Sequence, residues 1–363
     1  MKSYIDIDKN MVVNTTIGNV PVTWHDVRKA PFVLYGLHEP ETTKFFHRVP
    51  SEVASQTSDG VDKLSRECAG GRVRFTTDSP YIAIKVKYLV IGRSSHLTMV
   101  STAGFDLYID GEFGSRFIKE FRMPFDIVDS YEQIITLDGE NKRSYTINFP
   151  VHAVVASLEI GLKPGALLES PKPYRNIDPI IFYGSSIVHG TAATRPGNTY
   201  PAIISRDLNM DFRNIGFSGQ AKGEGVLANW LSTLPMSVFV CDYDHNAPTA
   251  EHLVDTHYQF YEIIRSKNPD VPYIMITRPD YWTHPREYEQ ILKRRDVIMS
   301  SYLKARASGD KNVYFIDGLS FNVGPNQYEM SVDGVHPNDA GFVRMANSIE
   351  TFIKHALERK YIL

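Results

Sequence analysis

Hydrophobic and polar positions follow two different periods along this chain. From about residue 10 to 165 the recurring pattern is alternation, with apolar side chains at every second position over 82–88 and 145–149. A period of two is that of half-buried β-strands. Because long helical periodicity is absent there, the pattern predicts an all-β first part, a β-sandwich or jelly roll built of antiparallel strands.

Asp-Gly pairs separate several of these alternating runs, at Asp59-Gly60, Asp110-Gly111 and Asp138-Gly139. Glycine adopts positive φ at little cost, as tight hairpin turns require. We therefore expect turns between strands at these three places.

In the second part, short apolar runs alternate with long stretches of helical spacing. One stretch places five residues on a single helix face, as does the last: Leu253, His257, Phe260, Tyr261 and Ile264 in one, and Phe342, Met345, Ile349, Phe352 and Ile353 in the other. The predicted strands are 180–183, 238–241, 273–276 and 313–316. Continuous apolar strands between such helices indicate an α/β fold with a parallel sheet covered on both faces.

Residues 163–173 contain the turn-forming segments Lys163-Pro164-Gly165 and Ser170-Pro171-Lys172-Pro173. Proline and glycine interrupt helices and strands, so we place a domain boundary here. The predicted domains are 1–174 and 175–363, and two domains agree with a length of 363 residues.

Composition limits the partners and the compartment. The formal net charge is −3 and no run of basic residues occurs, so a nucleic-acid partner is not expected. The two cysteines, Cys68 and Cys241, do not form a disulfide framework and are expected to be reduced. The N-terminus lacks the apolar region of a signal peptide, and no apolar stretch is long enough to span a bilayer. We expect a cytoplasmic protein without a membrane partner, although a leader removed from the chain stays possible.

A candidate nucleophile follows the first predicted strand of the second domain, in Tyr183-Gly184-Ser185-Ser186. Ligands of parallel α/β sheets collect at the carboxyl ends of the strands. Taken alone, Gly-Ser-Ser more often makes only a strand-to-helix turn. Val188 stands where an α/β-hydrolase elbow requires glycine, so that template does not apply.

A candidate base lies just before the last predicted helix, where Asp333 precedes His336 by three residues. A carboxylate at this spacing can accept the imidazole Nδ1 proton and leave Nε2 free to take a proton from a hydroxyl. The alternative is a helix start with Asn338 as its cap and a structural histidine in the loop.

Acyl transfer also requires hydrogen-bond donors for the developing oxyanion. Gly219, in the segment Asn214 to Gln220, could offer its backbone N–H, and Asn246, after the strand that ends at Cys241, could offer its side-chain amide. Each segment alone is also typical of an ordinary turn.

As an ordered set, these four segments resemble the four sequence blocks of the SGNH hydrolases, also called GDSL-type esterases and lipases. The resemblance implies a three-layer α/β/α, flavodoxin-like domain with Ser186 as nucleophile, His336 as base and Asp333 as its partner. It also implies an oxyanion hole formed by Ser186 N–H, Gly219 N–H and the Asn246 amide, without metal or other cofactor. Two of the blocks depart from the family pattern: Ser185 replaces the usual aspartate of the first, and Asp244-His245-Asn246-Ala247 stands in place of Gly-x-Asn-Asp.

The first domain carries a second resemblance. Gly104-Phe105-Asp106-Leu107-Tyr108 matches a Gly-x-Asp-Leu-Tyr signature of β-rich domains that precede SGNH domains in bacterial proteins. By itself the segment is also one alternating strand, with Phe105 and Leu107 on one face.

Several other polar residues lie in segments that could surround the cleft and bind a sugar or a carboxylate. They are Arg195, Tyr200, Arg278, Trp282 and His284.

The predicted function is hydrolysis of short-chain esters through an acyl-enzyme, by resemblance of O-acetyl groups on saccharides. The natural ester, the acyl length and the oligomeric state stay open. Two alternatives are a metal-dependent hydrolase built on Asp242, Asp244 and His245 with His252 or His284, and a carbohydrate-binding protein without catalysis.

Overall fold

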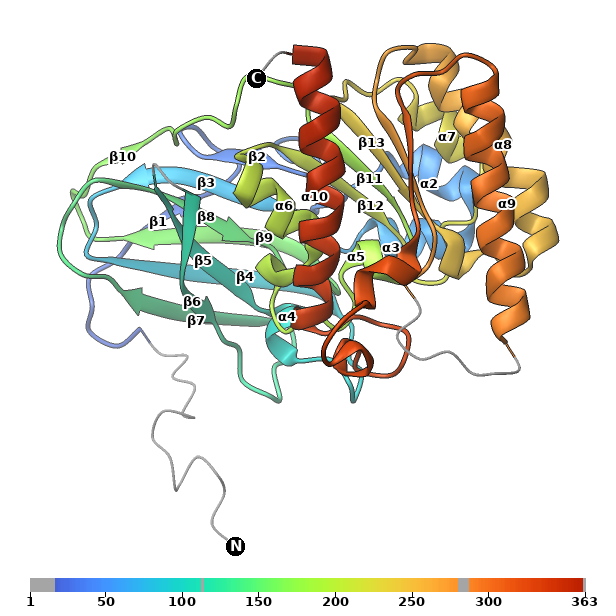
Figure 1. The fold of residues 1–363 in the computed structure, drawn as a ribbon. Coiled ribbons are helices and arrows are strands. Elements are labelled where there is room, and N and C mark those ends of the chain that lie inside the picture. The colour runs from blue at the N-terminus through green and yellow to red at the C-terminus, as the bar shows by residue number, and fades with distance from the viewer. Residues whose placement is uncertain (1–16, 112–113, 280–286, 362–363) are drawn as a thin grey trace, which may run out of the picture.

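The computed structural model describes residues 17–111, 114–279 and 287–361, and it shows two β-sheet systems side by side (Figure 1). The first part is a sandwich of two antiparallel sheets. One has the strand order β1-β9-β4-β7 and the other β10-β3-β8-β5-β6, with β2 added to β3. Their bounds are β1 Thr23–Asp26, β2 Val33–Tyr35, β3 Arg72–Thr77, β4 Tyr81–Ile91, β5 Phe105–Gly111, β6 Gly114–Phe121, β7 Ser130–Thr136, β8 Arg143–Asn148, β9 Ala153–Leu162 and β10 Leu168–Glu169.

The alternating residues of the sequence fill the core of this sandwich. Ile82, Ile84 and Val86 of β4 pack in one buried cluster with Tyr145 and Ile147 of β8, which belongs to the other sheet. The period of two therefore separates a core face from an outer face, as predicted.

The Asp-Gly expectations are met only in part. Asp110-Gly111 ends β5 in the β5–β6 hairpin, and Gly139 has φ +76° between β7 and β8, which lie in different sheets. The prediction for Asp59-Gly60 is wrong, because this pair begins helix α3 (Asp59–Ser65). The Ser58 side chain caps that helix by accepting a hydrogen bond from the Val61 N–H.

The second part has a five-stranded parallel sheet in the order β12-β11-β13-β14-β15, the flavodoxin-like order in which the second strand lies outside the first. The strands are β11 Ile180–Gly184, β12 Phe212–Gly216, β13 Val238–Asp242, β14 Tyr273–Ile276 and β15 Val313–Ile316. The helices are α5 Ser186–His189, α6 Tyr200–Leu208, α7 Gly225–Leu231, α8 Ala250–Lys267, α9 Tyr288–Ala307 and α10 Asp339–Tyr361.

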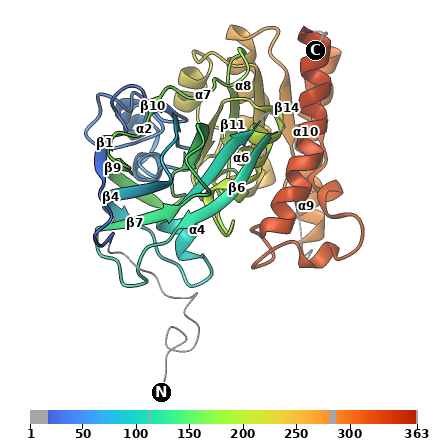
Figure 2. The same cartoon turned by 90° about the vertical axis from the view of Figure 1, so that its left-hand side faces the viewer.

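Helices cover both faces of this sheet, as Figures 1 and 2 show. Residues of α6 and α10 share one core cluster with Ile180 and Phe182 of β11, and residues of α7, α8 and α9 share another with Ile181 and Tyr183 of the same strand. The predicted faces of α8 and α10 are the ones that these clusters bury. The three-layer α/β/α prediction is confirmed.

The first half of the chain also supplies part of the second core. Its helices are α2 (Ser51–Thr57), α3 and α4 (Met99–Ala103). Ala54 of α2 and Val61 of α3 are fully buried in the cluster that contains α7 and α8. Helices α2 and α3 of the first half of the chain are therefore part of the core on one face of the parallel sheet.

Both cysteines are buried and free in this fold. Among the described residues, no helix combines the length and the apolar content needed to cross a membrane.

Candidate active site

Ser186 stands where β11 turns into α5. Gly184 ends the strand so close to β13 that a Cβ there would lie 2.0 Å from the Asp242 carbonyl oxygen, so only glycine fits. Ser185 is the N-cap, and its side chain accepts a hydrogen bond from the Ile187 N–H. Ser186 is therefore the first residue of the helix, where the backbone N–H has no partner within the helix.

His336 and Asp333 approach Ser186 from the loop before α10. The Ser186 Oγ lies 2.9 Å from His336 Nε2, and His336 Nδ1 lies 2.7 Å from Asp333 Oδ2. The other carboxylate oxygen of Asp333 accepts the N–H groups of Val335 and His336. Gly334, at φ +85°, permits this tight curl of the loop.

The charge state of Asp333 decides the direction of these hydrogen bonds. Burial alone would raise the pKa of this carboxyl, but hydrogen bonds from the His336 N–H and imidazole and from the Val335 N–H outweigh it and lower the pKa. An ionised Asp333 accepts the Nδ1 proton of His336, which leaves Nε2 as the acceptor for the Ser186 hydroxyl. Asn338 is also a helix cap, as expected, since its side chain accepts the Gly341 N–H.

The predicted oxyanion donors lie next to one another. The Gly219 N–H donates to Asn246 Oδ1 at 3.1 Å, and Asn246 Nδ2 donates to the Phe217 carbonyl at 2.8 Å. Gly219 has φ +68°. The second hydrogen of the Asn246 amide is left for a further acceptor, whereas the Gly219 N–H must share or exchange its partner to serve an oxyanion.

Two of the residues predicted to surround the cleft lie elsewhere. Tyr200 is fully buried in the core with α10, and its hydroxyl donates to Asp242, so its side chain cannot contact a substrate. Arg195 is directed to the first domain, where it pairs with Asp106 at 3.0 Å and donates to the Tyr108 hydroxyl.

The remaining three belong to the segment after β14. The Arg278 N–H donates to the Asp244 carboxylate at 3.0 Å. Trp282 and His284 lie outside the described residues.

The first half of the chain contributes a histidine near His336 that the sequence did not indicate. His96 lies in the loop between β4 and α4, and its ring centre is 6.3 Å from that of His336. Its Nε2 is 3.9 Å from Asp333 Oδ2. A single histidine in a loop without periodicity gives no signal, because only the fold brings residues 96 and 336 together.

The carboxylates of the metal alternative are engaged in other interactions. Asp242 is fully buried with Tyr200 against it, and burial raises the pKa of its carboxyl well above the ordinary value. Asp244 forms a buried ion pair with Arg294 at 2.9 Å. Within the described ranges, the groups with suitable ligand spacing are Glu67, His152 and His189, and His96, Asp333 and His336, so these carboxylates do not join His245 in one.

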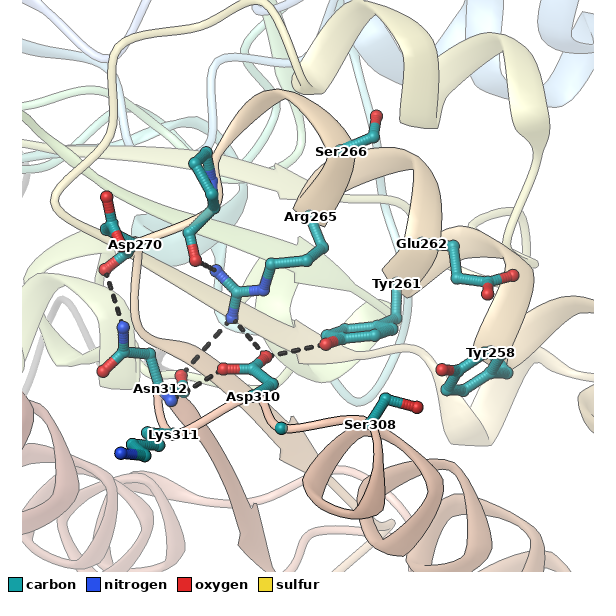
Figure 3. A pocket seen from close by; sticks show the side chains of 12 residues that line it. Tyr258, Tyr261, Glu262, Arg265, Ser266, Asp270, Ser308, Asp310, Lys311 and Asn312 are labelled. Atoms are coloured by element: carbon teal, nitrogen blue, oxygen red, sulfur yellow. Dashed lines mark hydrogen bonds and ion pairs between the residues drawn. The ribbon is translucent and has the colours of Figure 1, made fainter.

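A hollow of about 680 Å³ lies at the opposite end of the parallel sheet, lined by the end of α8 and the segments before β14 and β15 (Figure 3). Its polar groups bind one another. Asp310 accepts the Tyr261 hydroxyl at 2.6 Å and pairs with Arg265 at 2.9 Å, and Arg265 also donates to the carbonyl of Val271. This hollow faces the amino ends of the strands, away from Ser186.

The second part of the chain has the three-layer α/β/α fold, with Ser186, His336 and Asp333 in contact at the carboxyl end of β11. Residues 177–354 match the GDSL-like lipase/acylhydrolase family, and residues 22–168 match the GxDLY domain, the N-terminus of SGNH-hydrolase-type esterases. The two matches together take in most of the chain, which belongs to the SGNH-type, GDSL-like esterases.

Several solved structures have a similar fold. A structure from Bacteroides ovatus ATCC 8483, described as a GDSL-like lipase, is 29% identical, with 93% of this chain and 98% of that one covered and a TM-score of 0.84. A salicylyl-acyltransferase from a tetracycline biosynthetic pathway is 19% identical, with 92% and 97% covered and a TM-score of 0.73. An acetyl xylan esterase of the rumen bacterium Butyrivibrio proteoclasticus is 12% identical, with 93% and 99% covered and a TM-score of 0.54. Among curated proteins none matches this chain.

Proposed function

We propose that this esterase hydrolyses short-chain esters through an acyl-enzyme, with Ser186, His336 and Asp333 as its catalytic triad. The observation that carries the proposal is the series of contacts from the Ser186 Oγ to His336 Nε2 at 2.9 Å and from His336 Nδ1 to Asp333 Oδ2 at 2.7 Å. Hydroxyl, imidazole and carboxylate in this order are what nucleophilic acyl transfer requires.

The reaction follows from these contacts. His336 Nε2 takes the Ser186 proton as Oγ attacks the ester carbonyl, and the ionised Asp333 stabilises the imidazolium. The imidazolium then protonates the departing alcohol, leaving the acyl group on Ser186. Water repeats the same steps on the acyl-enzyme and releases the acid.

The oxyanion of each tetrahedral intermediate is expected to bind to the Ser186 N–H and the free hydrogen of Asn246 Nδ2. The Gly219 N–H joins them when it turns from Asn246 Oδ1 toward the substrate. One such donor is worth roughly 3 to 4 kcal/mol of transition-state stabilisation in serine hydrolases.

The proposed substrates are O-acetyl esters on saccharides. Support comes from fold likeness to the acetyl xylan esterase, and from the two-domain arrangement that brings His96 of the first domain, residues 1–174, beside His336 of residues 175–363. The salicylyl-acyltransferase has the same overall fold, so transfer of the acyl group to an alcohol other than water is a measurable alternative.

The experiment is a hydrolysis panel of acetylated sugars and aryl esters of increasing chain length. Ser186→Ala is the blank, and Ser205→Ala is the matched control, because Ser205 is a buried serine of α6 whose hydroxyl donates to the Met210 carbonyl, away from the site. We expect acetyl esters to react fastest, Ser186→Ala to lose activity and Ser205→Ala to keep it. Unchanged hydrolysis by Ser186→Ala would refute the proposal, and inactivity of the unmodified protein on every ester would favour the non-catalytic alternative.

A further inference from the structure

A second chain of hydrogen bonds links serine, histidine and carboxylate beside the proposed active site. Ser218 Oγ lies 3.2 Å from His189 Nδ1, and His189 Nε2 lies 3.0 Å from Glu67 Oε2. His189 ends the helix that Ser186 begins, and Ser218 directly precedes Gly219. Glu67 comes from the first half of the chain, so the two halves meet at this point.

The partners of His189 determine where its proton lies. Its Nε2 faces the Glu67 carboxylate and, at 3.1 Å, the Val151 carbonyl oxygen, and both of these groups accept hydrogen bonds. Burial, together with the nearby Arg48 charge, lowers the pKa of His189 to about 4, so the ring is neutral and carries one proton. That proton is on Nε2, which leaves Nδ1 to accept the Ser218 hydroxyl.

Glu67 is the acceptor at the end of the chain. Burial alone would raise the pKa of its carboxyl, but hydrogen bonds from His152 and His189 outweigh it and lower that pKa far below the ordinary value. His152 Nδ1 lies 3.3 Å from Glu67 Oε2, and its Nε2 lies 3.4 Å from the Thr191 hydroxyl. The carboxylate thus fixes the orientation of two imidazole rings, one of which holds Ser218.

Arg48 fixes the position of Glu67 relative to the loop after β12. It is fully buried and donates to four carbonyl oxygens, those of Leu64 and Glu67 in the first half of the chain and those of Asn214 and Gly216 in β12. The distance between the Glu67 backbone and the loop that carries Ser218 is therefore set by a rigid guanidinium group.

Ser218 controls a backbone group that the proposed reaction uses. The peptide between Ser218 and Gly219 carries the Gly219 N–H, and glycine has no side chain that could hold this peptide in place. The Ser218 hydroxyl holds it from one side and Asn246 from the other.

We propose that Glu67 and His189 are positioning residues of the esterase site, which hold Ser218 and thereby keep the Ser218–Gly219 peptide where its N–H can turn from Asn246 Oδ1 to the oxyanion. The inference rests on the proposed function, because it assigns these residues to the same oxyanion hole. It also gives the first half of the chain a part in catalysis.

The test measures kcat and KM for 4-nitrophenyl acetate with Ser218→Ala, Ser218→Thr and Glu67→Gln in the full chain. Loss of a whole oxyanion donor lowers kcat about 100-fold to 1000-fold in serine hydrolases, and we expect a misdirected donor to lower it roughly tenfold to a hundredfold. We expect KM within about twofold of the original value, because the loss falls on the transition state. Ser218→Thr keeps the hydroxyl and is expected to recover most of the loss.

A boronic acid that binds Ser186 as a tetrahedral adduct provides the readout that a purely structural role would not change. Its inhibition constant is expected to weaken in parallel with kcat in Ser218→Ala and Glu67→Gln. His257→Asn is the control, because His257 is as buried as His189 but lies on α8, outside the site. This change is expected to lower stability without changing kcat.

Three results would overturn the inference. The first is that Ser186→Ala is inactive while Ser218→Ala and Glu67→Gln keep full kcat. This result would leave the proposed function intact. The second is loss of kcat with an unchanged boronic acid constant. The third is a stoichiometric divalent metal in the purified chain that is lost in Glu67→Gln, since a metal on Glu67, His152 and His189 would replace the proton chain. Full activity of Ser186→Ala would instead reject the proposed function itself.

Discussion

Asp106 and Arg195 form an ion pair of 3.0 Å between β5 of the antiparallel sandwich and the loop before α6, with Asp106 fully buried. Asp106 is the aspartate of the Gly-x-Asp-Leu-Tyr signature, and it also accepts the Gly197 N–H at 2.8 Å. The same loop is bound at Thr194, whose N–H donates to the Asp339 carboxylate at 2.8 Å. Asp339 begins α10, directly after the loop that carries His336. The signature of the first domain therefore anchors a segment between the proposed nucleophile and the proposed base.

Asp106→Asn is expected to weaken this anchor and to lower activity. Loss of one partner of a buried ion pair destabilises a protein by roughly 3 to 5 kcal/mol. Asp110→Asn is the matched control, since Asp110 lies on the same strand and pairs with Arg74 at 3.0 Å within the first domain. Urea unfolding and kcat of the folded protein should show stability loss in both variants but reduced kcat only for Asp106→Asn. Equal kcat in the two variants would contradict this role.

Gly197→Ala tests how tightly the Gly197 backbone packs against Asp106, because it adds a methyl group at this contact. A Cβ at residue 197 would lie 2.4 Å from the Tyr108 hydroxyl and 2.8 Å from the Asp106 carboxylate. Overpacking of this kind costs about 1 to 3 kcal/mol. Gly225→Ala, in α7 with open space around its Cβ, is expected to be neutral or to stabilise by about 0.4 to 1 kcal/mol. Thermal unfolding of both variants decides the matter, and a Gly197→Ala protein as stable as the original would show that the loop is not tightly held.

Stability is expected to fall in mild acid because of buried histidines. Burial lowers the pKa of His257 from 6.5 to about 4, so between these values the unfolded chain binds a proton that the folded chain does not. The free energy of unfolding therefore decreases as the pH falls from about 6.5 to about 4, by roughly 3 kcal/mol for this residue. His189 acts in the same direction, with a pKa of about 4. Chemical unfolding at several pH values should show a smaller decrease for His257→Asn, and an unchanged pH dependence would refute the assignment.

The parts of this account that the sequence predicted are those with a local pattern. Alternation over 82–88 predicted a strand of the sandwich core, and helical spacing over 253–264 predicted a helix packed on the parallel sheet. Both patterns are readable because an element with one buried face repeats apolar residues at its own period. Tyr200 was placed wrongly since an aromatic residue with a hydroxyl fits either a cleft or a core, and only the packing of α6 against α10 decides. Glu67 and His96 give no local signal, because each reaches the site from a distant loop of the other domain.

A chelator is expected to leave hydrolysis unchanged. Asp242 and Asp244 are held by Tyr200 and Arg294, so they are not free to bind a catalytic metal ion. Activity on 4-nitrophenyl acetate after incubation with EDTA and desalting measures this directly. Loss of activity that is restored by a divalent metal would favour metal-dependent hydrolysis over the serine mechanism.

Covalent labelling of Ser186 tests the central claim most directly. A fluorophosphonate reacts with a serine hydroxyl that a neighbouring base activates, and peptide mass spectrometry locates the adduct. We predict one adduct per chain, on the peptide that contains Ser186, with loss of esterase activity in proportion to labelling and no adduct in Ser186→Ala. An adduct on another serine with Ser186 unmodified, or full activity after complete labelling of Ser186, would contradict the account.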